Sequence, residues 1–111
     1  MNIDDITYQI RGVIFEVNKV LGYGFLEKVY EKALMIELRG RGLRVENQVP
    51  LKVSYKGQIV GEYFADLLVE GRVIVEIKAV RHLLEEHQAQ LLNYLKATGI
   101  QIGLLVNFRK V

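Results

Sequence analysis

The sequence predicts an α/β fold in which a mixed central β-sheet is flanked by helices. Two amphipathic helical patterns open the chain, four strand-like segments follow, and a third helix precedes a last apolar strand. The final strand–helix–strand unit favours parallel pairing with a right-handed crossover, because such connections are nearly always right-handed. We therefore expect one domain over residues 1–111, in the order helix, helix, four strands, helix, strand.

Composition and charge set broad limits on function. The chain has 111 residues, half of them hydrophobic, which is enough for a single core. Its net charge of +2 neither demands nor excludes a nucleic-acid partner. The absence of cysteine excludes disulfides, thiolate catalysis and cysteine zinc sites. No apolar run approaches the ~20 residues that span a bilayer, and the acidic N-terminus is unlike a secretory signal, so we expect a cytoplasmic protein with no membrane partner.

The first helix is predicted to begin at Asp4 or Asp5, either of which can cap it, and to end at Gly22 and Gly24. We assign this helix a packing role. Its apolar side chains recur at helical spacing and form one stripe, which comprises Ile6, Ile10, Val13, Ile14, Val17, Val20 and Leu21.

Two further helices are expected, at residues 25–39 and 83–97. Gly40 and Gly42 end the first of these, and Gly99 ends the second. The long segment before the turn at residue 70 is expected to bend near Gly61. The predicted strands are residues 43–46, 51–55, 59–69, 72–80 and 100–108.

Three charged residues, Asp66, Glu76 and Lys78, lie within the most strand-like part of the chain, residues 64–80. Alternation along the strand places Glu76 and Lys78 on one face together with Ile74. Ionised side chains are rarely buried unless they are paired or bound to something. One interpretation is a structural ion pair between Glu76 and Lys78. The additional acid, Asp66, on the neighbouring strand favours a functional site.

The length of the turn decides whether Asp66 and Glu76 share a face of the sheet. A two-residue turn at Glu70-Gly71 pairs Ala65 with Glu76 and points Asp66 to the opposite face. An odd-length loop, such as residues 69–71 with the glycine left-handed, places Asp66 on the face of Glu76. The functional hypothesis needs the odd-length loop or an offset at the strand ends.

Two carboxylates held together favour a divalent cation, because each raises the cost of ionising the other unless a positive charge lies between them. Ligands that are all oxygen suit Mg²⁺ or Mn²⁺. A lysine beside such a site can orient or activate water, or stabilise negative charge that develops on a phosphate. These properties make Asp66, Glu76 and Lys78 candidates for metal-assisted phosphoryl chemistry.

The spacing of these residues resembles a known signature. Asp66, nine intervening residues and then Glu76-Ile77-Lys78 are similar to the signature of the PD-(D/E)XK nucleases, with Ala65 at the position usually occupied by proline. A short signature of this kind is weak when it stands alone. Two further motifs add to it.

The segment Gly24–Tyr30, GFLEKVY, resembles the G-x-x-E-x-x-Y motif of the GxxExxY proteins, a small branch of the same superfamily. Gln90 and Tyr94, four residues apart on one helical face, resemble the Q-x-x-x-Y motif of its exonuclease branch. The resemblance covers essentially the whole chain. It implies a restriction-endonuclease-like core.

The resemblance also implies a role for each matched residue near the metal. Asp66 and Glu76 bind Mg²⁺ or Mn²⁺, and Glu27 adds a third acid directly or through water. The backbone carbonyl of Ile77 is a further ligand. Lys78 positions or activates the attacking water and stabilises charge on the phosphate.

Gln90 and Tyr94 are expected beside the site, where they orient a carboxylate, a water or the lysine, or contact the substrate. Tyr30 either holds its helix or a carboxylate in position, or packs with its hydroxyl at the edge of the core. Glu27 has a simpler interpretation too, because acids are favoured in the first turn of a helix by its dipole.

The expected function is a metal-dependent nuclease that hydrolyses phosphodiester bonds of DNA, with branched and single-stranded DNA among the candidate substrates. A domain of this size has little room for a separate DNA-reading element, so we expect a homodimer or a larger assembly. The alternative is a non-catalytic module that keeps the nuclease fold and binds nucleic acid or protein. A structural ion pair in an unrelated α/β domain is a third interpretation.

Overall fold

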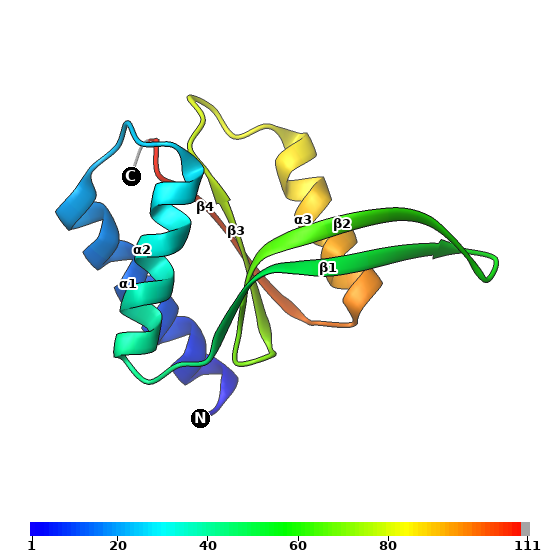
Figure 1. The fold of residues 1–111 in the computed structure, drawn as a ribbon, viewed down its shortest axis with the longest axis horizontal. Coiled ribbons are helices and arrows are strands. Elements are labelled where there is room, and N and C mark those ends of the chain that lie inside the picture. The colour runs from blue at the N-terminus through cyan, green and yellow to red at the C-terminus, as the bar shows by residue number, and fades with distance from the viewer. Residues whose placement is uncertain (110–111) are drawn as a thin grey trace.

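The computed structural model describes residues 1–109 of the chain. A four-stranded sheet with the strand order β1-β2-β3-β4 lies between the helices (Figure 1). The predicted mixed α/β fold with flanking helices is confirmed. Its elements are α1 (Ile3–Leu21), α2 (Glu27–Gly40), β1 (Val45–Tyr55), β2 (Gln58–Val69), β3 (Val73–Lys78), α3 (Glu85–Thr98) and β4 (Ile102–Asn107).

The strands predicted at residues 43–46 and 51–55 form one continuous strand, β1, which includes Pro50. Three strands therefore precede α3, and the prediction of four was wrong. Pro50 is tolerated because β1 is an outer strand of the sheet, where a residue without an N–H group removes fewer ladder hydrogen bonds.

The hairpin between β1 and β2 turns through Lys56 and Gly57, which have φ values of 49° and 82°. Two successive positive φ angles are typical of the tight turns whose twist matches that of the flanking strands. The register shifts between Val53 and Ser54, opposite Gly61, so the predicted bend near this glycine is a β-bulge.

The hairpin between β2 and β3 pairs Val69 with Val73. It therefore has a three-residue loop at residues 70–72, in which Glu70 and Gly71 have φ values of 54° and 64°. The loop has the odd length that the functional hypothesis needs, although it begins one residue later than expected. This register places Asp66 opposite Glu76 when it is continued beyond the last paired residues.

Strand β4 pairs with β3 in parallel, as predicted for a strand–helix–strand unit. None of the helices within residues 1–109 is long and apolar enough to cross a bilayer.

Two clusters of buried side chains lie on opposite faces of the sheet. Val73, Val75 and Ile77 contribute to the larger cluster beneath α1 and α2, whereas Ile74 belongs to the smaller cluster beneath α3. This confirms the alternation predicted for the strand. The smaller cluster consists of Leu51, Ala65, Ile74, Leu91 and Tyr94.

Candidate active site

Asp66 and Glu76 face each other at the point where β2 and β3 diverge. Leu67 and Val75 form the last regular pair between these strands. Beyond it, the backbone N–H of Asp66 donates to Oε2 of Glu76 at 2.7 Å, and the N–H of Ile77 donates to Oδ2 of Asp66 at 2.7 Å. The two carboxylates thus take the place of the next ladder hydrogen bonds, which fixes the position of both acids on the opened sheet.

The sheet opens here because β1 and β2 twist, so that their buried side chains pack beneath α1 and α2 on one side of this point and beneath α3 on the other. Val45 and Leu67 pack in the cluster beneath α1 and α2, whereas Leu51 and Ala65 pack in the cluster beneath α3. Gln48 lies at this change in β1 with a φ of 50°, a conformation that residues other than glycine rarely adopt. From this point β1 and β2 continue as a two-stranded arm that passes over α3 (Figure 1).

Gln48 links Asp66 to a second buried acid, Glu31, which is 4% exposed. Oε1 of Glu31 accepts a hydrogen bond from Nε2 of Gln48 at 2.8 Å, and the same amide nitrogen lies 3.4 Å from Oδ1 of Asp66. Oε2 of Glu31 accepts from Nδ2 of Asn47 at 3.2 Å and faces Nζ of Lys28 at 3.5 Å. A continuous polar network therefore runs from α2 through β1 to Asp66.

Sequence reasoning missed both Glu31 and Gln48. A signal for Glu31 was available, because it follows Glu27 by four residues and lies between Tyr30 and Leu34, which point inward. A charged residue at such a position predicts a buried partner. Nothing in the local sequence predicts a role for Gln48. Its strained φ angle and the two carboxylates that accept from its amide depend on segments that are distant in the chain.

Glu27 lies at the other end of the site, in the first turn of α2. Its Oε2 accepts a hydrogen bond from the backbone N–H of Ala79 at 3.1 Å, directly after Lys78. Its charge also helps to raise the pKa of Glu76. The structure therefore brings the predicted third acid to the end of β3 that carries Glu76 and Lys78.

Tyr30 holds the segment before α2 in place. Its hydroxyl donates to the carbonyl of Gly22 at 2.7 Å and accepts from the N–H of Phe25 at 3.3 Å. Its ring is fully buried and stacks on that of Phe108, with the centroids 4.3 Å apart. These contacts agree with the packing interpretation and position the first turn of α2, which carries Glu27.

Lys78 is half-buried, and its backbone is held by β4. The N–H of Phe108 donates to the carbonyl of Lys78 at 2.8 Å. The side-chain amide of Asn107 binds both the N–H and the carbonyl of Val80, at 3.0 and 2.8 Å. Among residues 1–109, the ion pairs are Lys28–Glu31, Arg41–Glu37 and Arg44–Glu70, so the structural pair between Glu76 and Lys78 is not observed.

The acids are held together against their own repulsion. Burial raises the pKa of Glu76 to about 7, and the charges of Asp66 and Glu27 add to the effect, although the N–H of Asp66 and the ammonium of Lys78 oppose it. Burial likewise raises the pKa of Asp66, with a contribution from Glu31. Carboxylates in this situation gain from a cation, which removes the repulsion and the cost of burial together.

The donor set fits an oxygen-preferring divalent cation, since Asp66, Glu76 and Glu27 supply only carboxylates. In the part of the chain that the structure describes, no three acids or histidines are already arranged to hold a metal ion. One oxygen of each of these acids accepts a backbone N–H instead. A metal ligand role for the carbonyl of Ile77 stays a prediction.

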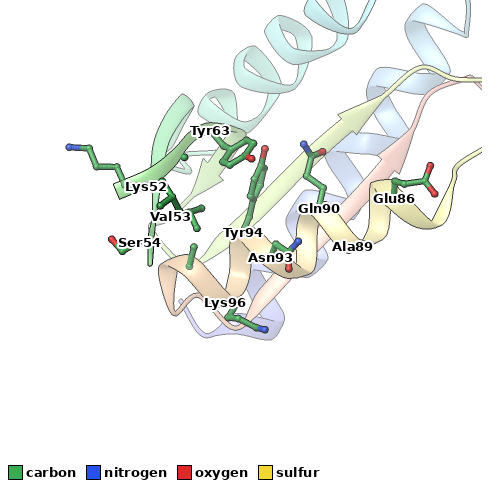
Figure 2. Close-up of a pocket in the computed structure, with 13 residues that line it drawn as sticks. Lys52, Val53, Ser54, Tyr63, Glu86, Ala89, Gln90, Asn93, Tyr94 and Lys96 are labelled. Atoms are coloured by element: carbon green, nitrogen blue, oxygen red, sulfur yellow. The ribbon is translucent and has the colours of Figure 1, made fainter. Parts of the chain in front are cut away.

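Gln90 and Tyr94 lie on α3, above the same face of the sheet. Tyr94 packs with Ala65 and Ile74 beside the acid pair, where burial raises the pKa of its phenol and the charges of Glu76 and Asp66 raise it further. Both residues line a groove of about 790 Å³ between α3 and the arm formed by β1 and β2 (Figure 2). The roles that the motif implies for Gln90 and Tyr94 at the acid pair stay predictions.

A mixed sheet that opens around two opposed acids, with a lysine beyond them on the same strand, defines a nuclease-type α/β domain. The family whose sequence model matches is the PD-(D/E)XK nuclease superfamily, over residues 4–111. The chain belongs to this superfamily, whose nucleases generally use divalent metal ions. Searches of curated proteins and of solved structures gave no significant match.

Proposed function

We propose that this protein is a metal-dependent nuclease of the GxxExxY branch, which hydrolyses phosphodiester bonds of DNA. One observation carries the proposal. Asp66 and Glu76 each accept the backbone N–H that the opened ladder leaves free, so two partly buried carboxylates face each other beside Lys78. A protein gains nothing in stability from burying two repelling acids, whereas a cation-binding site requires it.

Each residue of the site has a task in hydrolysis. Asp66 and Glu76 would hold Mg²⁺ or Mn²⁺, and Glu27 would bind the same ion directly or through water. When bound, the ion would supply Lewis acidity and make water a better nucleophile. Lys78 carries the positive charge that orients the water and stabilises the phosphate in the transition state. The attacking water gives up a proton as its oxygen bonds to phosphorus, one P–O bond of the backbone breaks, and the leaving oxygen takes a proton.

Glu31 and Gln48 are positioning residues in this scheme, because they act through Asp66. The Gln48 amide is held by Glu31 at 2.8 Å and limits the rotation of the Asp66 carboxylate. Gln90 and Tyr94 cover the site from α3 and orient water or substrate. A site of this kind depends on supporting contacts to hold its ligands in the productive geometry.

A homodimer and a cytoplasmic location are part of the proposal. β4 is an outer strand of the sheet, and α1 exposes large apolar side chains at Tyr8, Phe15 and Val20. Both features support an interface with a second copy, which would let a small domain contact two segments of DNA.

One observation favours the alternative of a non-catalytic binding module. The three acids are not arranged around a common point in residues 1–109, so the metal site is not preformed. A binding module would keep the fold and the acid pair without holding a metal ion. Metal affinity therefore separates the two functions.

The test is cleavage of labelled linear, nicked, single-stranded and four-way-junction DNA with Mg²⁺ or Mn²⁺, repeated in EDTA. Asp66→Ala and Lys78→Ala should abolish cleavage, whereas Lys19→Ala on α1 should not change it. Isothermal calorimetry should show the metal ion bound by the wild type and not by Asp66→Ala. Absence of both cleavage and metal binding would favour the binding module.

A further inference from the structure

We propose that the groove between α3 and the arm of β1 and β2 binds a single-stranded segment of DNA, with one base stacked on Tyr63. The inference rests on the proposed nuclease function and names the form of the substrate. The groove adjoins the acid pair, since Tyr94 lines it (Figure 2) and also packs with Ala65, which precedes Asp66, and with Ile74, which shares its face of β3 with Glu76.

The side chain of Tyr63 is exposed to solvent and is fixed in position by its neighbours. Its side chain is 47% exposed although it projects from a strand. On one side its ring lies 5.9 Å from the ring of Tyr94, which is 6% exposed and packed in the smaller core cluster. The ring also lies so close to Gly61 that an added Cβ would be 3.1 Å from its edge atom Cε2. The backbone of Gly61 and the ring of Tyr94 therefore fix Tyr63 before any ligand binds.

A fixed aromatic ring with an exposed face is what base stacking needs. Every base presents a π-face, so the contact does not depend on sequence. A duplex keeps its bases stacked on one another and offers none to a side chain, whereas a single strand can present them. The geometry of Tyr63 therefore selects for unpaired nucleotides.

The polar side chains that line the groove from α3 suit a phosphate backbone. Lys96 supplies a positive charge and Glu86 a negative one, whereas the amine of Lys52 on β1 extends away from α3 (Figure 2). Asn93 and Gln90 add amides that can bind the edges of bases or phosphate oxygens. The volume of about 790 Å³ is in the range of pockets that enclose a ligand of one or two nucleotides, and is much smaller than a duplex.

The first experiment measures binding without chemistry. Fluorescence anisotropy in EDTA would compare a labelled single strand of about 12 nucleotides with the duplex of the same sequence. Wild type should bind the single strand at least about tenfold more tightly. Tyr63→Ala should weaken this binding about tenfold, and Tyr63→Phe should retain it. Tyr55→Ala, which removes a 62% exposed tyrosine from β1 outside the groove lining, is the matched control and should have no effect.

A second pair of variants tests the groove without removing any packing. Ala89 is exposed on α3 and lines the groove. Ala89→Lys should tighten binding of the single strand and Ala89→Glu should weaken it, because only the charge facing the phosphates differs. Lys96→Ala should lower the salt dependence of binding by about 0.7 in log–log slope, as expected for one phosphate contact on a single strand.

The outcomes separate this inference from the proposed function. Equal affinity for duplex and single strand, or unchanged binding in Tyr63→Ala and in both Ala89 variants, would refute the proposal that the groove binds single-stranded DNA. Tight single-strand binding in EDTA without any cleavage in Mg²⁺ or Mn²⁺ would support single-strand binding in the groove and refute the nuclease function. Metal-dependent cleavage that the Tyr63 and Ala89 substitutions do not change would support the nuclease function and refute single-strand binding in the groove.

Discussion

Neutralising Glu76 should make the protein more stable. Its pKa of about 7 in the folded chain lies above the ordinary value of 4.5. Between these values the folded state binds a proton that the unfolded state has released, so stability falls as the pH rises from about 4.5 to about 7 and is then constant. Above pH 7 the folded protein carries the full cost of the buried charge, and Glu76→Gln removes it.

The size of the effect follows from the shift. A pKa raised from 4.5 to about 7 corresponds to about 3 kcal/mol as an upper bound. Structural relaxation and screening reduce such values, so we expect about 1–2 kcal/mol. Glutamine has nearly the same shape, and its carbonyl oxygen can still accept the N–H of Asp66, so the substitution leaves this hydrogen bond in place.

Urea unfolding followed by circular dichroism would measure the difference. Glu76→Gln should be more stable than wild type by about 1–2 kcal/mol at pH 8 and equal to it near pH 4. The control is Glu46→Gln, an exposed acid on β1, which should show no pH-dependent difference. A variant that is no more stable than wild type at pH 8 would refute the argument that Glu76 is buried at a cost.

Three further predictions concern the site and its support. Saturating Mg²⁺ should raise the melting temperature of wild type at pH 8 and leave that of Asp66→Asn unchanged, as measured by calorimetry, because the ion binds only the native acid pair. Tyr30→Phe should lower the free energy of unfolding by about 1–2 kcal/mol in urea, since the carbonyl of Gly22 loses its buried donor. Gly103→Ala should lower it by about 1–3 kcal/mol, because the new Cβ would lie 2.7 Å from Leu91 of α3.

The two stability substitutions have matched controls. Tyr8→Phe alters an exposed tyrosine and should be neutral, and Gly40→Ala adds a methyl group where no atom lies within 4 Å. Equal destabilisation by Gly40→Ala and Gly103→Ala would contradict the close packing of α3 on β4. Stabilisation of Asp66→Asn by Mg²⁺ to the same extent as wild type would place the metal elsewhere.

The sequence alone determined the elements that local patterns encode. Helical spacing predicted α2 at residues 25–39, and the structure has Glu27–Gly40. Alternation placed Val73 and Ile74 on opposite faces of the sheet, because a strand directs successive side chains to opposite sides. The motif residues Asp66, Glu76 and Lys78 could be identified for the same reason, as charges that interrupt apolar strands.

Only the tertiary structure decided how those residues meet. The sequence was consistent with even and odd turns, and pairing of Val69 with Val73 selected the register that opposes Asp66 and Glu76. The left-handed φ of Gln48 and its bonds to Glu31 and Asp66 join three segments that are far apart in the chain. Strand register and buried polar contacts depend on how segments that are far apart in the sequence pair with one another. The hydrophobic periodicity of one segment shows only which face of its own helix or strand a residue occupies.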